Sequence, residues 1–259
     1  MRSIPRTAAT TLAALATFAL AAAPAPARAQ VLPSAKSLMD KHDAAVGGRT
    51  ALDKHTSIHQ AGTLSMAAAG LDATIDIYRL KPTMFLQKLV IGTVGEVLQG
   101  FDGKTAWAMQ GPQAMVLDSA QAQQFRYNSD FFGNLHDPSR YKSAETVEQV
   151  EFDGRQCYKV KLVRLSGAEG FEFFDVATGL GAGMIASNET PMGKVEQTSV
   201  FGDYKDFGGV KFPTKILQKG AMGEITITLK TTEFDAVDPS TFALPDAVKA
   251  LVKPSGATP

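Results

Sequence analysis

Apolar and polar residues alternate with a period of two along most of this chain. In residues 71–80, Leu71, Ala73, Ile75 and Ile77 fall on one side of an extended backbone, and polar residues fall between them. Such alternation is typical of a strand with one apolar and one polar face. The pattern therefore predicts a mainly β protein. The predicted strands are residues 57–67, 71–80, 83–92, 94–101, a strand containing Trp107, 143–152, 155–164, 170–176, 182–190, 193–204, 211–219 and 223–235.

Asp-Gly pairs mark two of the connections between these strands. Asp102-Gly103 and Asp153-Gly154 favour the positive φ angles of a tight two-residue hairpin turn. Consecutive strands joined by short turns form an antiparallel meander. Because a sheet of about ten strands rarely stays flat, we expect it to curl, and the 23 glycines of the chain favour that curvature.

Three segments depart from the strand pattern and predict helices. Residues 34–46 begin at Ser34, a good capping residue, and end at Gly47-Gly48. Residues 118–132 contain no β-branched residue, and residues 246–252 predict a short helix near the C-terminus. Helices are the elements available to cover an apolar concave sheet face. The space between helices and sheet is then a common site for apolar ligands.

The first thirty residues have the layout of a secretory signal peptide. Two arginines precede the apolar residues 8–23, and small residues at 27 and 29 predict cleavage before Gln30. A membrane anchor is the alternative, but the apolar segment is short for a span of about 20 residues, and Pro24 and Pro26 interrupt it. We expect a signal peptide at 1–29, a single domain at 30–245, a C-terminal tail at 246–259, and a periplasmic location.

The charge of the chain argues against polyanionic partners, and its cysteine content excludes stabilisation by an internal disulfide. Without the three arginines of residues 1–29, the balanced chain of 26 basic and 26 acidic residues carries a net charge of −3. No basic tract is present, which argues against nucleic acid or an anionic membrane surface as partner. Cys157 is the only cysteine, so no internal disulfide forms, and we expect it to be a small packing residue within a strand.

The residue patterns for catalysis and metal binding are weak. His55 and His59 are four residues apart, but their segment passes from a helix end into a strand, so the two rings do not share a helical face. His42 and His136 are the remaining histidines that can approach in space. The chain has no Gly-x-Ser-x-Gly motif and no carboxylates with separable roles. We therefore expect no catalytic residues, no metal and no cofactor.

Apolar side chains from both halves of the chain are the candidates for a ligand-binding lining. The alternative is that they form the core that any β domain needs. Residues 118–135 are the predicted lid, because large apolar residues crowd this irregular stretch. The candidate lining residues are Met66, Ile75, Ile77, Met84, Leu86, Leu98, Trp107, Met109, Phe125, Phe131, Phe132, Leu135, Phe173 and Met184.

Five segments, in this order, resemble the outer-membrane lipoprotein-sorting proteins, a group of periplasmic carriers and receptors. They are Ala44–Gly48 (AAVGG), Phe101–Trp107 (FDGKTAW), Phe174–Leu180 (FDVATGL), Tyr204–Pro213 (YKDFGGVKFP) and Asp238–Pro245 (DPSTFALP). The resemblance covers most of the chain after residue 29. Each motif alone is turn chemistry, and their order carries the specificity.

The resemblance implies a curved, antiparallel, half-open β-barrel of about eleven strands, an α+β fold with helices over the concave face. It also implies a cavity for lipoprotein acyl chains, other lipids or hydrophobic small molecules. The chain looks longer than the dedicated carriers, and the carriers' functional arginine has no matching position. It also lacks the lipid-anchored cysteine of the outer-membrane receptor.

Two functions are favoured by the sequence, and an enzyme is a third class that would require three polar titratable groups to converge in one cleft. The first is a periplasmic carrier that holds a lipid, lipoprotein or other hydrophobic ligand in an apolar cavity. The second is an envelope interaction or sensor module, in which the same sheet docks a protein partner without lipid. An enclosed cavity favours the first, whereas an exposed apolar patch or an unpaired edge strand favours the second.

Overall fold

The computed structural model describes residues 31–92, 94–118, 122, 125–126, 129–190, 193–221 and 223–252, with the backbone alone at 188–190 and 193–194. The chain divides into two units, Met1–Val31 and Leu32–Pro259, and the second contains the helices and strands named below. The predicted signal peptide lies outside the described residues. No helix in the described ranges is long and apolar enough to cross a bilayer.

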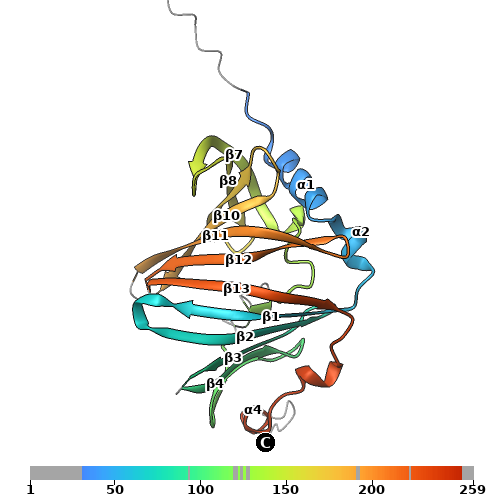
Figure 1. Cartoon of the computed structure of the whole chain (residues 1–259), viewed down its shortest axis with the longest axis vertical. Helices are drawn as coiled ribbons and strands as arrows, with labels where there is room; N and C mark the ends of the chain where they lie inside the picture. Colours follow the sequence, from blue (N-terminus) through green and yellow to red (C-terminus); the bar gives the residue numbers. More distant parts are fainter. Residues whose placement is uncertain are drawn as a thin grey trace, which may run out of the picture. The chain divides into compact units, whose positions relative to one another are not determined.

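The second unit is built on one antiparallel sheet. Its thirteen strands are β1 (Ser57–Met66), β2 (Leu71–Leu80), β3 (Met84–Ile91), β4 (Gly95–Phe101), β5 (Ala106–Gln110), β6 (Gln113–Val116), β7 (Tyr141–Phe152), β8 (Arg155–Arg164), β9 (Glu169–Asp175), β10 (Gly181–Thr190), β11 (Gly193–Phe207), β12 (Val210–Gly220) and β13 (Gly223–Phe234). Figure 1 shows them side by side from β7 to β4.

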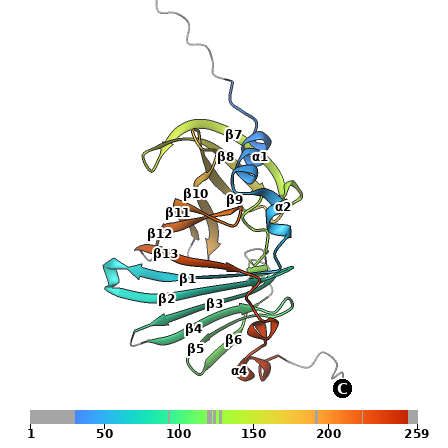
Figure 2. The same ribbon diagram turned by 45° about the vertical axis from the view of Figure 1, so that its right-hand side comes forward.

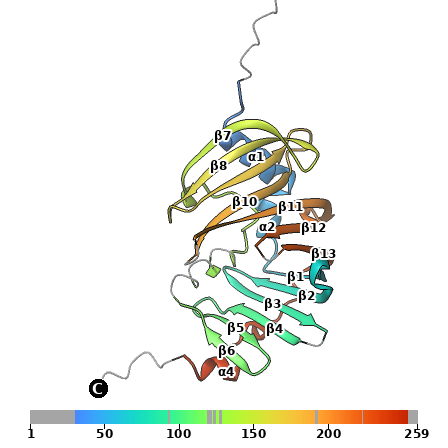
Figure 3. The ribbon, with the colours of Figure 1, turned by 90° about the vertical axis from the view of Figure 1, so that its left-hand side faces the viewer.

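The strand order places the two halves of the sequence on opposite halves of the sheet. The order is β6-β5-β4-β3-β2-β1-β13-β12-β11-β10-β9-β8-β7, so the first and last strands pair at the centre. Strands β6 and β7 follow each other in the sequence but form opposite edges of the sheet, with the other eleven strands between them (Figure 3). The chain between β6 and β7 must therefore cross the sheet.

The mainly β prediction is confirmed, and the sheet is open at β6 and β7. The strand count is thirteen, where the family resemblance implies about eleven. Strand β6, a four-residue edge strand, is too short for the period-two pattern to reveal. At the predicted turn between β7 and β8, Asp153 and Gly154 both have positive φ angles, 49° and 72°, as a two-residue hairpin requires.

Two helices precede the sheet in sequence and pack on it. Helix α1 (Ala35–Ala45) matches the predicted helix, and the Ser34 side chain accepts a hydrogen bond from the backbone N–H of Ser37 at 3.2 Å. Helix α2 (Gly48–Asp53) follows directly, after Gly47 with a φ of 105°. A Cβ on Gly47 would lie 2.0 Å from the carbonyl oxygen of Gly209, so only glycine lets this turn lie against the β11–β12 turn.

The remaining helical segments are short. They are the 3₁₀ helices η1 (Ala67–Ala69), η2 (Pro138–Arg140) and η3 (Pro239–Phe242) and helix α4 (Asp246–Lys249). Helix α4 occupies the start of the predicted 246–252 helix and lies against β6 (Figure 2). Of the predicted helix at 118–132, the described residues 122, 125 and 126 are helical, and most of the others lie outside the described residues.

We call the sheet face that carries α1 and α2 the inner face. Leu38 and Met39 of α1 pack there on Val160, Leu162 and Phe174. Antiparallel partners point to the same side of a sheet, and successive residues point to opposite sides, so the register assigns every side chain in a regular ladder to one face. Leu52 of α2 lies in a second inner cluster with Ile58, Phe131, Val210 and Phe212.

The opposite face has its own cluster, formed by Cys157, Phe173 and Ala182. Cys157 is completely buried within β8, and burial raises the pKa of its thiol to about 11. A thiol that stays protonated at neutral pH is a poor nucleophile, so Cys157 acts as a packing residue.

Candidate ligand-binding cavity

The connection from β6 to β7 crosses the inner face, and we call residues 129–137 of this connection the roof segment. Three contacts fix it. The backbone N–H of Phe131 donates to the carbonyl of Pro82 at 3.3 Å, Asp130 Oδ1 accepts from the N–H of Phe132 at 3.0 Å, and Asp130 forms an ion pair with Arg140. Because Phe131 also lies in the inner cluster with Leu52, the roof segment bridges α2 and the sheet.

Between α1, the roof segment and the inner face lies a cavity of about 330 Å³. This volume is at the lower end of the range for small-molecule sites. The apolar lining residues are Val46, Ile58, Phe131, Leu135, Phe173, Phe174, Met184, Phe201, Phe212 and Ile216. The polar and charged lining residues are His42, Arg79, Asp130, Asn134, His136, Tyr141, Arg164, Glu172, Tyr204 and Lys211.

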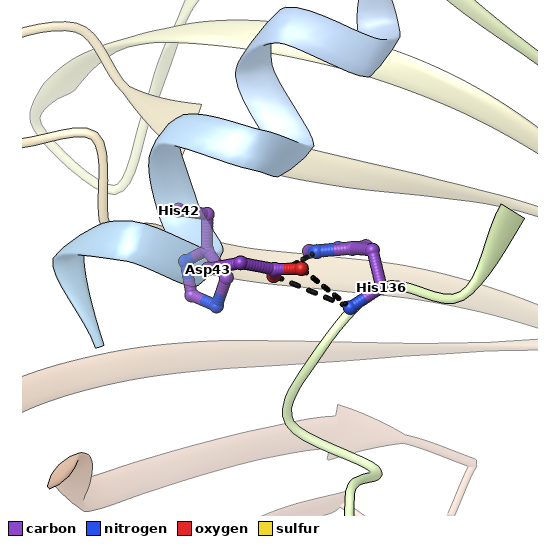
Figure 4. Close-up of side chains that lie close together, drawn as sticks. All are labelled: His42, Asp43 and His136. Atoms are coloured by element: carbon purple, nitrogen blue, oxygen red, sulfur yellow. Dashed lines mark hydrogen bonds and ion pairs between the residues drawn. The ribbon is translucent and has the colours of Figure 1, made fainter. Parts of the chain in front are cut away.

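His136 of the roof segment lies between two carboxylates from different elements. Its Nδ1 is 2.7 Å from Oδ1 of Asp43 in α1, and its Nε2 is 2.8 Å from Oε2 of Glu172 in β9. The backbone N–H of His136 also donates to both carboxylate oxygens of Asp43, at 3.2 and 3.1 Å (Figure 4). These bonds tie α1, the roof segment and the sheet together.

The two carboxylates determine the charge of His136. Its side chain is only 10% exposed, and burial alone would lower its pKa. The hydrogen bonds and charges of Asp43 and Glu172 outweigh burial and raise the pKa of His136 to about 9. The imidazole is therefore a cation at neutral pH, with both ring nitrogens donating.

His42 has the opposite protonation state. Its Nδ1 accepts a hydrogen bond from the backbone N–H of Gly181 at 2.9 Å, which requires an unprotonated nitrogen, and the ring also hydrogen-bonds to the backbone of Asn134. Burial and the nearby charge of His136 lower the pKa of His42. The two rings lie edge to face with centroids 5.3 Å apart, so a neutral and a charged histidine are adjacent.

The cluster is extended to β11 by Tyr204. Its hydroxyl donates to the carbonyl of Gly181 at 3.0 Å, and burial raises the pKa of Tyr204, which keeps the hydroxyl protonated. A Cβ on Gly181 would lie 3.3 Å from both the His42 ring and the Tyr204 hydroxyl. The small residue at 181 therefore lets both side chains approach the same backbone.

His42, Asp43 and His136 each offer an atom within 4.8 Å of the others, which is a metal-like spacing. Their hydrogen bonds argue for a different role. The one lone pair of His42 is engaged by Gly181, and both nitrogens of His136 donate to carboxylates. A metal would have to displace all three bonds, so the geometry fits a closed hydrogen-bonded clamp better. The absence of a metal stays a prediction.

The other two histidines lie elsewhere, as their sequence context predicts. His55 pairs with Asp235 and His59 with Asp76, each at 2.8 Å, and the two rings stack on different aromatic side chains, Phe234 and Tyr78.

Arg79 of β2 also borders the cavity, but its neighbours differ from those of His136. Its Nη1 donates to Oε1 of the buried Gln60 at 3.1 Å, and Gln60 Nε2 donates to the hydroxyl of Thr232 at 3.3 Å. The guanidinium lies 5.6 Å from the ring centroid of Phe85. Burial lowers the pKa of Arg79 to about 10, and the side chain is still a cation at neutral pH.

The predicted lining residues fall into several groups. Phe131, Leu135, Phe173 and Met184 border the cavity. The ring of Phe173 also stacks on Phe152 in the opposite-face cluster. Phe132 lies in the roof segment, where it packs against the α2 cluster.

Four more of the predicted residues belong to the inner side of β1 to β3, away from the cavity. The register places Met66, Ile75 and Ile77 on the same face as Ile58. Phe125 contacts Phe85 edge to face, over that same side.

Five of the predicted residues lie on the face opposite Ile58. The ladders from β1 to β5 pair Ile58 with Arg79, Arg79 with Phe85, Phe85 with Phe101 and Phe101 with Ala106, which fixes that face. The side chains that alternate with these point the other way. They are Met84, Leu86, Leu98, Trp107 and Met109.

The sequence interpretation missed the polar lining of the cavity, above all Arg79, Glu172 and Tyr204. Each lies within a strand, where a lone polar residue looks like part of a solvated face. The one signal in the sequence was the pair of isolated histidines, His42 and His136, which the structure brings together.

Comparison with known proteins identifies the fold. No family model matches the sequence, and no curated protein matches it. A DUF1329 family protein from Desulfovibrio piger is 11% identical with a TM-score of 0.54, over 81% of this chain and 97% of its own. A LolA superfamily protein from Nitrosomonas europaea is 11% identical with a TM-score of 0.54, and the match covers 82% of this chain and 99% of its own. A putative outer membrane lipoprotein-sorting protein domain from Vibrio parahaemolyticus is 11% identical with a TM-score of 0.55, and the match covers 80% of this chain and 94% of its own.

At this level of identity the likeness establishes the fold alone. The sequence motifs predict the lipoprotein-sorting group, and one of the three structures is an outer membrane lipoprotein-sorting protein domain. The chain therefore has the fold of the LolA superfamily and of the outer-membrane lipoprotein-sorting proteins.

Proposed function

We propose that this protein is a periplasmic carrier that holds one hydrophobic ligand, a lipid or a lipoprotein acyl chain, between the roof segment and the inner face. The observation that carries the proposal is the cavity of about 330 Å³, whose apolar lining residues include Ile58, Phe212 and Ile216. The predicted signal peptide supports the periplasmic location, with cleavage before Gln30.

Burial of acyl chain surface supplies the binding energy. Each buried methylene contributes about 0.8 kcal/mol, and ordering the ligand offsets part of that gain. A site of this volume suits a single acyl chain rather than a large lipid. We assign no catalytic role to the His136 cluster, because both ring nitrogens of His136 are engaged by carboxylates.

An interaction module is the second candidate function, and one observation favours it. Strand β6 is an edge strand, and its Met115 and Val116 are 56% and 40% exposed. An exposed apolar edge is a template for pairing with another chain. In that function a protein partner would add to β6, and the cavity would stay empty.

The direct test is native mass spectrometry and lipid extraction of protein purified from the periplasm after expression of the full chain. We expect a bound acyl compound and displacement of a fluorescent acyl probe. An Ile216→Trp variant fills the cavity and should reduce probe binding at least tenfold. Val90→Trp is the matched control, since Val90 is 41% exposed on the opposite face. Protein that is always empty and ignores acyl probes would refute the carrier function.

A further inference from the structure

The cavity is not apolar throughout, and two of its charged regions differ in whether the charged side chains have ion-pair partners. At β9, His136 forms ion pairs with both Glu172 and Asp43. At β2, Arg79 has an amide oxygen and an aromatic ring as neighbours. No carboxylate among the described residues forms an ion pair with Arg79. A partly buried guanidinium without an anion is an unusual arrangement, because a buried charge is normally paired.

The position of Arg79 is fixed before any ligand arrives. Thr232 orients Gln60, and the Gln60 amide oxygen holds one arm of the guanidinium. The pairing of Arg79 with Ile58 places both side chains on the inner face, and both border the cavity. An oriented guanidinium presents its remaining N–H donors in a planar fork that matches the two oxygens of a carboxylate or a phosphate.

The charge distribution of the cavity favours an anion at β2 over the other charged region. Asp43, His136 and Glu172 together carry one negative charge when the histidine is protonated, so that cluster repels an anion. Asp130 is neutralised by Arg140. The apolar wall at Phe131 and Phe212 lies in the same cavity as Arg79. A molecule with an apolar chain and one anionic end can contact both the apolar wall and Arg79.

We propose that Arg79, positioned by Gln60, binds the anionic end group of a single-chain amphiphile whose acyl chain fills the cavity. This inference rests on the proposed carrier function and specifies the class of its ligand. The shared chemistry is a carboxylate or phosphate oxyanion on one acyl chain. At pH 7.5 the guanidinium is charged, so the contact forms without a proton transfer.

The test compares dodecanoate, dodecyl phosphate and neutral dodecanol as competitors of a fluorescent acyl probe, at pH 7.5, on protein from the periplasmic fraction. In the unmodified protein the anionic compounds should bind more tightly than dodecanol. In Arg79→Gln their affinity should fall about 10- to 100-fold, as expected for one charge-assisted hydrogen bond pair, while dodecanol binding is unchanged. The anion with the larger loss identifies the end group.

Arg126→Gln is the matched control, because Arg126 also lies 5.6 Å from a phenylalanine ring, that of Phe101, but it is exposed and does not border the cavity. It should bind all three compounds normally. Arg79→Lys keeps the charge without the planar fork and should show an intermediate preference for the anions. This variant keeps the test decisive if Arg79→Gln does not fold.

Three results would overturn the inference. Equal affinity for dodecanoate, dodecyl phosphate and dodecanol in the unmodified protein would refute the anion site and leave the carrier function standing. Loss of anion binding in Lys211→Gln but not in Arg79→Gln would place the site at Lys211, another cationic residue of the lining. Failure of all three compounds to bind would refute the carrier function and the inference together.

Discussion

The His136 cluster and Arg79 border the same cavity, but one is a complete hydrogen-bond network and the other is not. His136 donates to Asp43 and Glu172, and His42 accepts from Gly181 and hydrogen-bonds to the backbone of Asn134. Arg79 has one amide acceptor and no ion-paired carboxylate in the described ranges. A polar network that satisfies all its members stabilises a single structure, whereas an incomplete one is available to a ligand.

Sheet topology explains why the two regions differ. Glu172 lies on β9 and Arg79 on β2, with β1, β13, β12, β11 and β10 between them in the sheet. The roof segment and α1 reach the first region and supply its partners from outside the sheet. At the second region Gln60 comes from the neighbouring strand β1. At one wall of the cavity, side chains therefore supply the partners of the charged groups. At the other wall, we expect the ligand to supply the partner of Arg79.

The largest expected effect comes from removing the central cation of the complete cluster. In His136→Phe, Asp43 and Glu172 lose their shared partner while they remain about four-fifths buried. We expect a loss of about 3 kcal/mol in the free energy of unfolding, measured by urea denaturation. For a domain of this size that corresponds to roughly 6–12 °C in Tm.

His59→Phe is the matched control for this prediction. His59 also contacts a carboxylate at 2.8 Å, that of Asp76, but the pair is on the opposite face and more exposed. Its loss should cost below about 1 kcal/mol. Equal destabilisation by the two variants would contradict the view that the His136 cluster clamps the roof.

The pH dependence of stability separates His136 from His42. The pKa of His136 is raised in the folded protein to about 9, so its contribution is fully present below its unfolded value of 6.5 and is lost as the pH rises through about 9. The pKa of His42 is lowered, so its folded form resists protonation and stability falls as the pH drops below 6.5.

Urea denaturation between pH 5.5 and 9.5 should therefore give a maximum of stability near neutral pH. The alkaline decline should be about 2 kcal/mol, less than a fully buried histidine would give, because Asp43 and Glu172 keep some solvent contact. His136→Gln should remove the alkaline decline and keep the acidic one. An unchanged alkaline decline in that variant would assign it to other groups.

The sequence pattern predicts most of the strands of the sheet, because each strand is encoded by the alternation of a few consecutive residues. The predicted strands at 71–80 and 155–164 have the same bounds as β2 and β8. Most consecutive strands pair with each other as hairpins, and short turns such as Asp153-Gly154 encode these hairpins directly. Secondary structure and an antiparallel meander can therefore be read from the residues.

The assignment of faces cannot be read in the same way. Alternation shows that a strand has two faces, but it does not show which of them the roof covers. In β3, Met84, Phe85 and Leu86 are consecutive apolar residues, so both faces look like a lining. Trp107 is 2% exposed, as a lining residue would be, yet the register places it on the face opposite Ile58.

The polar side of the candidate site is set by contacts between distant residues. Asp43, His136 and Glu172 meet because the β6–β7 connection crosses the sheet, and that follows from the pairing of β1 with β13 at its centre. No local motif encodes this pairing. The sequence alone therefore gives apolar candidates for a cavity but not the charged groups that determine which ligand it accepts.

The smallest expected effect tests whether the complete cluster is closed to ligand. In Tyr204→Phe the hydroxyl that donates to the Gly181 carbonyl is lost, while His42 still accepts from the Gly181 N–H. We expect a decrease of about 1 kcal/mol in the free energy of unfolding and no change in the affinity for dodecanoate. Stability is measured by urea denaturation and affinity by probe competition. A loss of affinity tenfold or more in this variant would mean that Tyr204 contacts the ligand. The His136 region would then be a second polar contact of the ligand, and the contrast with Arg79 would fail.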